Sequence, residues 1–259
     1  MLPGNAILSV LDYLEGEVGL YLEDVTVGDK LAVNPNQIFP SASIIKIPVL
    51  AALFKAAAEG KVDLNAKTTL KAENRVGGGG VLTELSIKLR PTVLDLATLM
   101  IIVSDNAATN ELIDLVGMDQ VNDLVRKLGL KQTVLQRKMM DRTAAKEGRD
   151  NFTSAQDMGL LLQLLAKGQV VNEEASTKII DIMKKQQLRN KLPSQLPREV
   201  IVAHKTGDLD FLEHDVGIFF LPERTYILAI LTDKLSSNAA GAQAIADVSQ
   251  IVYQTLREE

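Results

Sequence analysis

Ser43 and Lys46 are the first side chains in this sequence whose types and spacing suit nucleophilic catalysis. They lie three positions apart where a helix is expected to begin, so both fall on the same helix face. A serine hydroxyl becomes a useful nucleophile when a base takes its proton. Lys46 can be that base if burial and a neighbouring cation lower its pKa. The alternative is structural, since this spacing is more often a helix-capping serine and a solvated lysine.

The beginning of this helix offers Ser43 a second role. Near a helix N-terminus the backbone N–H has no acceptor within the helix, so the N–H of Ser43 can hold a developing oxyanion. Pro48 lies inside the predicted helix and leaves the carbonyl of Ile44 without its usual partner. A broken local rule of this kind favours a nearby functional site, although a harmless kink gives the same pattern.

A second polar segment, Ser104–Asn106, lies between two predicted helices. Its residues are expected to cap the helix that begins at Ala107. Ser104 can also relay a proton between the lysine and a leaving nitrogen, and Asn106 can bind an amide carbonyl and orient the lysine. The structural and the chemical interpretations of this segment are compatible.

A third segment, Lys205–Asp208, is predicted to end a strand, because it follows an apolar and β-branched run. Lys205 and Thr206 can bind a substrate carboxylate, and Gly207 allows a substrate to lie close along the strand. The backbone N–H of Asp208 can complete an oxyanion hole. Lys205 can also be the neighbouring cation that lowers the pKa of Lys46. The alternative is an exposed lysine followed by a turn glycine.

The composition excludes several other kinds of site. The chain has 259 residues, no cysteine and only two histidines, His204 and His214. Disulfides, thiolate catalysis and cysteine-ligated zinc are therefore excluded, and a multi-histidine metal site is not expected. The net charge of −5, without a long basic run, argues against nucleic acid as a partner. We expect no metal and no organic cofactor, and a small molecule as the substrate.

The periodicity of apolar residues predicts the elements that carry these segments. The predicted helices are 5–15, 43–59, 93–103, 107–116, 118–128, 154–166, 173–187 and 243–256, and the predicted strands are 17–25, 30–33, 199–205, 216–221 and 226–232. Residues 137–151 are expected to form a long functional loop. Strands at both ends that enclose a helical middle predict one sheet with an inserted helical lobe, and a cleft between them.

The three motifs occur in the order Ser-x-x-Lys, Ser-Asp-Asn and Lys-Thr-Gly, which is the signature of class A β-lactamases and penicillin-binding proteins. In these motifs and their spacing the chain resembles that superfamily over nearly its whole length. The resemblance implies an α/β three-layer fold: a mainly antiparallel sheet with flanking helices (residues 1–60 and 190–259) and an all-helical lobe (residues 61–189). It also implies that Ser43 is acylated, that Lys46 and Ser104 handle protons, and that Asn106, Lys205 and Thr206 contact the substrate.

The long loop departs from the superfamily pattern. Class A enzymes carry there a Glu-x-x-Leu-Asn segment whose glutamate activates the deacylating water, and residues 135–149 contain no such segment. Asp141 or Glu147 can be proposed as a substitute carboxylate. The structural alternative for Asp141 is a salt bridge with Arg137 or Arg142. The sequence therefore predicts acylation of Ser43 but does not predict rapid hydrolysis of the acyl-enzyme.

The two histidines receive different predictions. His204 precedes Lys205 on its strand, so its side chain is expected on the opposite face with a structural role. His214 lies near the place where many class A enzymes have an arginine, and a part-charged imidazole there can help bind a substrate carboxylate. Asp208 and Asp210 add negative charge that would oppose such a carboxylate, and the sequence alone offers no explanation for them.

Three functions follow for the chain. The leading one is a serine hydrolase of β-lactamase type that forms an acyl-enzyme with β-lactam-like substrates. The second is a D-Ala-D-Ala-type peptidase or an esterase with slow β-lactam deacylation, and the third is a non-catalytic penicillin-binding sensor. We expect a soluble monomer without a membrane span. The first residues lack a secretory signal, which predicts a cytoplasmic protein, or an extracytoplasmic one if a leader has been removed.

Overall fold

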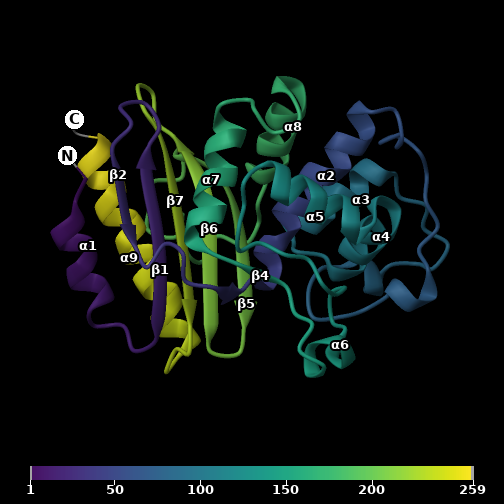
Figure 1. The fold of residues 1–259 in the computed structure, drawn as a ribbon, viewed down its shortest axis with the longest axis horizontal. Helices are drawn as coiled ribbons and strands as arrows, with labels where there is room; N and C mark the ends of the chain where they lie inside the picture. Colours follow the sequence, from purple (N-terminus) through teal and green to yellow (C-terminus); the bar gives the residue numbers. More distant parts are fainter. Residues whose placement is uncertain (1, 258–259) are drawn as a thin grey trace.

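A five-stranded antiparallel sheet forms the centre of the protein, whose computed structural model describes residues 2–257 (Figure 1). The strand order is β2-β1-β7-β6-β5. The strands are β1 (Glu17–Asp24), β2 (Lys30–Val33), β5 (Ile201–Leu209), β6 (Leu212–Phe220) and β7 (Thr225–Asp233). The first two come from the beginning of the chain and the other three from its end, which confirms the predicted sheet built from both termini.

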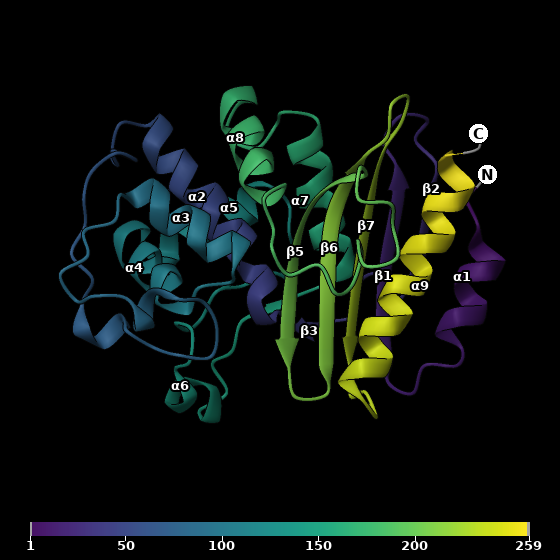
Figure 2. The ribbon, with the colours of Figure 1, turned by 180° about the vertical axis from the view of Figure 1, so that it is seen from behind.

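Helices cover both faces of this sheet, so its central strands are buried almost throughout. On one face lie α1 (Gly4–Leu11) and α9 (Asn238–Arg257), which pack against each other (Figure 2). On the other face α7 (Ala155–Ala166) packs on β1, β6 and β7. Apolar side chains from α1 and α9, such as Ile7 and Val248, fill the layer against the first face.

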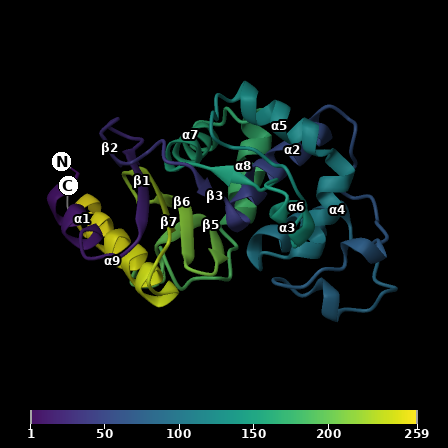
Figure 3. The same cartoon turned by 60° about the horizontal axis from the view of Figure 1, so that its bottom comes forward.

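The remaining helices gather beyond the β5 edge of the sheet, away from α1 and α9 (Figure 3). They are α2 (Lys46–Ala58), α3 (Val93–Ile102), α4 (Asn106–Val116), α5 (Met118–Lys127), the short α6 (Arg142–Lys146) and α8 (Glu173–Met183). The short 3-10 helices are η1 (Ala42–Ile45), η2 (Ala72–Asn74) and η3 (Leu82–Glu84), and β3 (Phe39–Pro40) pairs with β4 (Phe152–Thr153). Helix α2 is the centre of this group, because it contacts α3, α4, α5 and α8 and every residue from Lys46 to Phe54 is buried.

The predicted α/β class, with a mainly antiparallel sheet, flanking helices and a helical part, is confirmed. The division into a lobe of residues 1–60 and 190–259 and a lobe of residues 61–189 stays a prediction. Helix α2 lies within the first range but packs among the helices, and α7 lies within the second but packs on the sheet. Within residues 2–257 no helix combines the length and the apolar character that a membrane crossing requires.

Several predicted boundaries were wrong, and the hairpin of β5 and β6 is the one that matters for function. Strand β5 was predicted to end at Lys205 and β6 to begin at Val216, but the two strands pair as far as Leu209 and Leu212. The polar residues of this stretch interrupt the apolar pattern, yet ladder pairing satisfies their backbone groups. The first helix ends at Leu11, the helix after residue 173 ends at Met183 and the last helix begins at Asn238.

Candidate active site

Ser43 lies in η1, immediately before α2. The predicted helix start at Ser43 was therefore three residues early, and Pro48 falls in the first turn of α2. Backbone N–H groups have no intrahelical acceptor in a first turn, so the missing N–H of proline is tolerated there. The side chain of Ser43 is half-buried and lines a cavity of about 240 Å³. The cavity is also lined by Ala42, Gly78, Asn106, Arg137, Met139, Met140, Asp141, Arg142, Ala145, Asn151, Asp208 and Leu209.

The backbone amide of Ser43 faces strand β5 at Gly207. A Cβ atom added to Gly207 would lie 3.2 Å from the amide nitrogen of Ser43 and 3.1 Å from the Cβ of Ala42. A side chain at position 207 would therefore crowd the nucleophile, and glycine keeps this approach open. Ser43 and Asp208, whose backbone N–H groups are the predicted oxyanion donors, both line the cavity.

Lys46 is fully buried at the beginning of α2. Its Nζ lies 2.8 Å from the carbonyl oxygen of Ser104, 3.0 Å from Ser104 Oγ and 2.8 Å from Asn106 Oδ1. Burial lowers the pKa of the Lys46 ammonium well below its ordinary value, and the charge of Lys205 lowers it further. The amine is thus held by neutral acceptors, an arrangement that favours a lysine able to accept a proton.

Ser104 connects two amines. Its Oγ lies 3.0 Å from the Nζ of Lys46 and 3.0 Å from the Nζ of Lys205. Lys205 is also fully buried, and its Nζ donates to the carbonyl oxygen of Thr206 at 2.7 Å. Burial lowers the pKa of Lys205 to about 7, although the carboxylates of Asp208 and Asp215 oppose this. Ser104 has a left-handed backbone with φ of 54°, the kind of local strain that folds retain at functional sites.

Asp105 and Asn106 hold this arrangement in place. Asp105 Oδ1 caps α4 by accepting from the amide of Ala108 at 2.9 Å, so the predicted capping is confirmed with α4 beginning one residue earlier. Asp105 Oδ2 accepts from the amides of Val81 and Leu82. Asn106 donates through Nδ2 to the carbonyl of Gly77 at 3.0 Å while its Oδ1 meets the first lysine. Asn106 therefore positions both Lys46 and the backbone at Gly77.

Strand β5 does not offer a free lysine to a substrate. The predicted binding of a carboxylate by Lys205 and Thr206 meets a structural obstacle, because both residues are buried and the ammonium of Lys205 already has two partners. The Oγ1 of Thr206 is buried without a hydrogen-bond partner. Asp208, in contrast, lines the cavity beside Ser43.

The geometry of His214 disagrees with a substrate-binding role. The ring is fully buried, with Nε2 2.8 Å from the carbonyl oxygen of Pro40 and Nδ1 2.9 Å from that of Glu213. Burial lowers the pKa of His214 to about 4, so the ring is neutral near pH 7. His204 is also fully buried, and its Nδ1 lies 2.9 Å from Asp215 Oδ1. Its Nε2 has no hydrogen-bond partner, so the His204 ring is hydrogen-bonded through one of its two nitrogens.

Asp141 lines the cavity from the long loop, but one of its oxygens has a structural partner. Its Oδ1 accepts from the amide of Ala144 at 3.0 Å and caps α6. The alternative of a salt bridge with Arg137 was wrong, because Arg137 Nε pairs with Asp150 Oδ1 at 2.8 Å. Glu147 pairs with Arg149 at the exposed surface. Of the two carboxylates proposed for deacylation, only Asp141 lies at the cavity.

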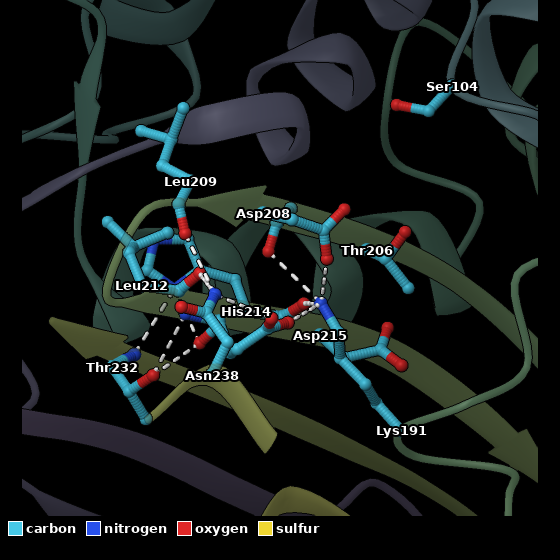
Figure 4. A network of polar contacts seen from close by, with 12 residues as sticks. Ser104, Lys191, Thr206, Asp208, Leu209, Leu212, His214, Asp215, Thr232 and Asn238 are labelled. Carbon is cyan, nitrogen blue, oxygen red and sulfur yellow. Dashed lines mark hydrogen bonds and ion pairs between the residues drawn. The ribbon is translucent and has the colours of Figure 1, made fainter. Parts of the chain in front are cut away.

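Lys191 is the residue near the site that the sequence analysis missed. It is fully buried, and its Nζ lies 3.1 Å from the carbonyl oxygens of both Gly207 and His214. The same ammonium pairs with the carboxylates of Asp208 and Glu213 (Figure 4). This pairing explains how Asp208 can be accommodated here, which the sequence left unexplained. Lys191 comes from an irregular segment before β5, without a motif that could have indicated it. Within residues 2–257 no group of three histidine or acidic side chains could hold a metal ion.

Comparison with known sequences identifies a family. The family model described as "Beta-lactamase enzyme family" matches residues 3–256. A curated beta-lactamase from Bacteroides uniformis is 25% identical, over 98% of this chain and 90% of that protein. Beta-lactamase CARB-3 from Pseudomonas aeruginosa is 30% identical, over 75% of this chain and 68% of that protein.

Several solved structures have a fold similar to that of this chain. A beta-lactamase from Sphaerobacter thermophilus superimposes with a TM-score of 0.92 at 33% identity, covering 97% of each chain. A structure described as PBP-A superimposes with a TM-score of 0.89 at 29% identity and covers the whole of both chains. A point mutant of PBP-A, solved as an acyl-enzyme complex with penicillin G, has a TM-score of 0.89 at 30% identity, covering 98% of this chain and 96% of that one.

Proposed function

Because the chain belongs to the beta-lactamase enzyme family, we propose that it is a serine hydrolase in which β-lactam-like substrates acylate Ser43 and water then releases the product. The observation that carries this proposal is the position of Ser104 Oγ, 3.0 Å from each of two buried amines. Ser43 lines the cavity, and so does Asn106, whose Oδ1 lies 2.8 Å from the Nζ of Lys46. The beta-lactamase and PBP-A relatives support the same chemistry.

Acylation begins with loss of the Ser43 hydroxyl proton. A neutral Lys46 amine has two N–H bonds, which the carbonyl oxygen of Ser104 and Oδ1 of Asn106 can accept at 2.8 Å each. Its lone pair then remains to take the proton as Ser43 Oγ bonds to the substrate carbonyl carbon. The carbonyl π electrons move onto oxygen, where the backbone N–H groups of Ser43 and Asp208 can stabilise the negative charge.

Collapse of this intermediate breaks the bond to the leaving nitrogen or oxygen, which needs a proton. Ser104 is placed to deliver it, because its hydroxyl can give its proton to the leaving group and regain one from Lys46. The amine of Lys205 on the other side of the same hydroxyl fixes the orientation of Ser104. In this scheme Asn106 orients Lys46, and the carbonyl oxygen of Thr206 holds the amine of Lys205.

Deacylation needs a water molecule and a base. The loop lacks the glutamate motif of class A enzymes, and Asp141 is the loop carboxylate at the cavity. One oxygen of Asp141 caps α6, so the other would have to activate the water. We therefore expect the acyl-enzyme of this protein to be hydrolysed more slowly than the acyl-enzyme of a class A enzyme that has the glutamate.

The direct test is the fate of Ser43 after treatment with nitrocefin and with penicillin G. We expect a mass increase equal to the whole β-lactam, located on Ser43, together with measurable nitrocefin hydrolysis. Ser43→Ala should abolish both, whereas Ser41→Ala, two residues away and outside the cavity, should retain them. Absence of both colour change and adduct in the wild-type protein would contradict the proposal.

A second candidate, a D-Ala-D-Ala-type peptidase or an esterase, shares the acylation step. The observation that favours it is the loop without a dedicated deacylating glutamate, in a chain 29% identical to PBP-A. A long-lived penicillin adduct together with rapid ester hydrolysis would support this candidate. Rapid β-lactam hydrolysis without action on esters or peptides would exclude it. Turnover that is lost in Ser43→Ala would exclude the non-catalytic sensor.

A further inference from the structure

Asp208 brings a negative charge to the cavity beside the nucleophile. Its side chain is 52% exposed and lines the same cavity as Ser43. The preceding residue, Gly207, is the one whose backbone lies against the Ser43 amide. A substrate carbonyl held by the amides of Ser43 and Asp208 would therefore place its neighbouring atoms close to the Asp208 carboxylate.

The positive charge nearest to Asp208 is already matched. Lys191 is fully buried, and its ammonium pairs with Asp208 and with Glu213 and lies 3.1 Å from two carbonyl oxygens (Figure 4). Partial burial alone would raise the pKa of Asp208, but the ammonium of Lys191 outweighs it and holds the pKa below its ordinary value. Glu213 is fixed in addition by Asn238, whose Nδ2 donates to its Oε1 at 2.8 Å. One cation thus contacts two carboxyl groups, and burial raises the pKa of Glu213, although Lys191 opposes this.

On the β5 side, Lys205 and His214 already have other partners, whereas Thr206 Oγ1 has none. Lys205 is buried and bound to Ser104 and to a carbonyl oxygen. His214 is buried and neutral, with both ring nitrogens against backbone groups. The cationic side chains that line the cavity, Arg137 and Arg142, belong to the long loop and α6 on the other wall, and Arg137 pairs with Asp150.

We propose that Asp208 determines substrate charge: it disfavours a carboxylate close to the scissile carbonyl, and the preferred substrates are neutral esters, thioesters or amides. This inference rests on the proposed acyl transfer at Ser43 and narrows it. β-Lactams carry a carboxylate on the ring fused to the scissile amide, so they acylate Ser43 more slowly than neutral acyl donors of similar reactivity. The physical cause is repulsion between two negative charges in a partly desolvated cavity.

The test compares two thioesters with the same acyl group and leaving thiols that differ only in a terminal carboxylate or carboxamide. We expect wild-type kcat/KM to be about tenfold higher for the carboxamide. Asp208→Asn removes one charge and keeps the shape and the backbone N–H, so the preference should fall to about twofold or reverse. Asp210→Asn is the matched control, because Asp210 lies exposed in the turn two residues later. It should leave the preference within about twofold of the wild type, as expected for a screened surface charge.

The outcomes separate this inference from the proposed function. If both thioesters acylate Ser43 and the wild-type protein prefers the carboxylate, or Asp208→Asn leaves the preference unchanged, the charge proposal is wrong while acyl transfer stands. An equal shift in Asp210→Asn and Asp208→Asn also overturns it, because general surface charge would then be the cause. If neither thioester nor penicillin G acylates Ser43, the proposed function fails and this inference fails with it.

Discussion

Two clusters next to strand β5 contain fully buried lysines in opposite surroundings. In the first, Lys46 and Lys205 meet hydroxyl, carbonyl and amide oxygens. In the second, Lys191 pairs with the carboxylates of Asp208 and Glu213. The same residue type is thus buried once without and once with an opposite charge in direct contact.

The surroundings of the lysines decide what each cluster can do. Burial without a carboxylate in direct contact lowers the pKa of both lysines in the first cluster, so each amine loses its proton more readily than an exposed lysine does. A buried ion pair keeps its charge, and losing one partner leaves the other uncompensated. We therefore interpret the first cluster as the catalytic one and the second as a device that holds strand β5 and the charge of Asp208 in place.

The largest effect is expected from Lys46→Met. It removes the proposed base, so the acylation rate of Ser43 should fall about a thousandfold. Because Lys46 is a buried amine with no carboxylate in direct contact, an apolar side chain in its place should leave the free energy of unfolding equal or raise it by about 1 kcal/mol. Stopped-flow acylation and urea unfolding measure the two quantities.

Lys46→Arg is the control for charge at this position. A guanidinium keeps the positive charge but does not give up its proton, so it should be as inactive as Lys46→Met. Activity near the wild-type level in either variant would show that another group is the base. A loss of stability of several kcal/mol in Lys46→Met would show that the two clusters do not differ as described.

Lys191→Met should give the opposite pattern in stability. It leaves the carboxylates of Asp208 and Glu213 without their cation, and removal of one partner of a buried pair costs about 3 kcal/mol. Urea unfolding checks this value. Adding Asp208→Asn and Glu213→Gln to Lys191→Met should restore at least half of the loss, because the uncompensated charges are then gone. If Lys191→Met and Lys46→Met both lower the free energy of unfolding, the proposed difference between the two clusters is wrong.

The residues of the first cluster could be predicted from the sequence, because they belong to short motifs. The spacing of Ser43 and Lys46, and their order with Ser104 and Lys205, led to the expectation of proximity, and the structure places the two lysines on one hydroxyl. The sheet was also predictable, since β5, β6 and β7 each contain an apolar run with β-branched residues. The roles of these residues stay a prediction.

The second cluster could not be read from the sequence. Lys191 meets Asp208 and Glu213 only because β5 and β6 pair along their full length. That extension was missed, because polar residues after Lys205 break the apolar pattern that predicts a strand. The burial of His214 also depends on tertiary packing, because its ring contacts the carbonyl oxygen of Pro40, which is far away in the sequence. Register and long-range pairing are properties of the folded chain that local periodicity does not contain.

The smallest effect, and the one that probes the first cluster without chemistry, is the pH dependence of stability. Lys205 has a folded-state pKa of about 7, below its ordinary value. Between this value and the ordinary pKa near 10.4 the unfolded chain binds the extra proton, so stability must rise as pH increases through this window. From pH 7 to pH 9 the gain from Lys205 should be about 2 kcal/mol. Lys46 acts in the same direction.

Equilibrium unfolding in urea at several pH values measures this slope, and Lys205→Met is the variant that isolates it. The slope should decrease in that variant by the contribution of Lys205 and persist in Lys191→Met, whose lost cation is paired in the folded state. His214, with a pKa of about 4, adds its own rise only below its ordinary pKa of 6.5, outside this window. A wild-type stability that falls from pH 7 to pH 9 would mean that the buried amines remain charged. Lys46 could then not accept the proton of Ser43 without first losing its own, and the contrast between the two clusters would lose its chemical meaning.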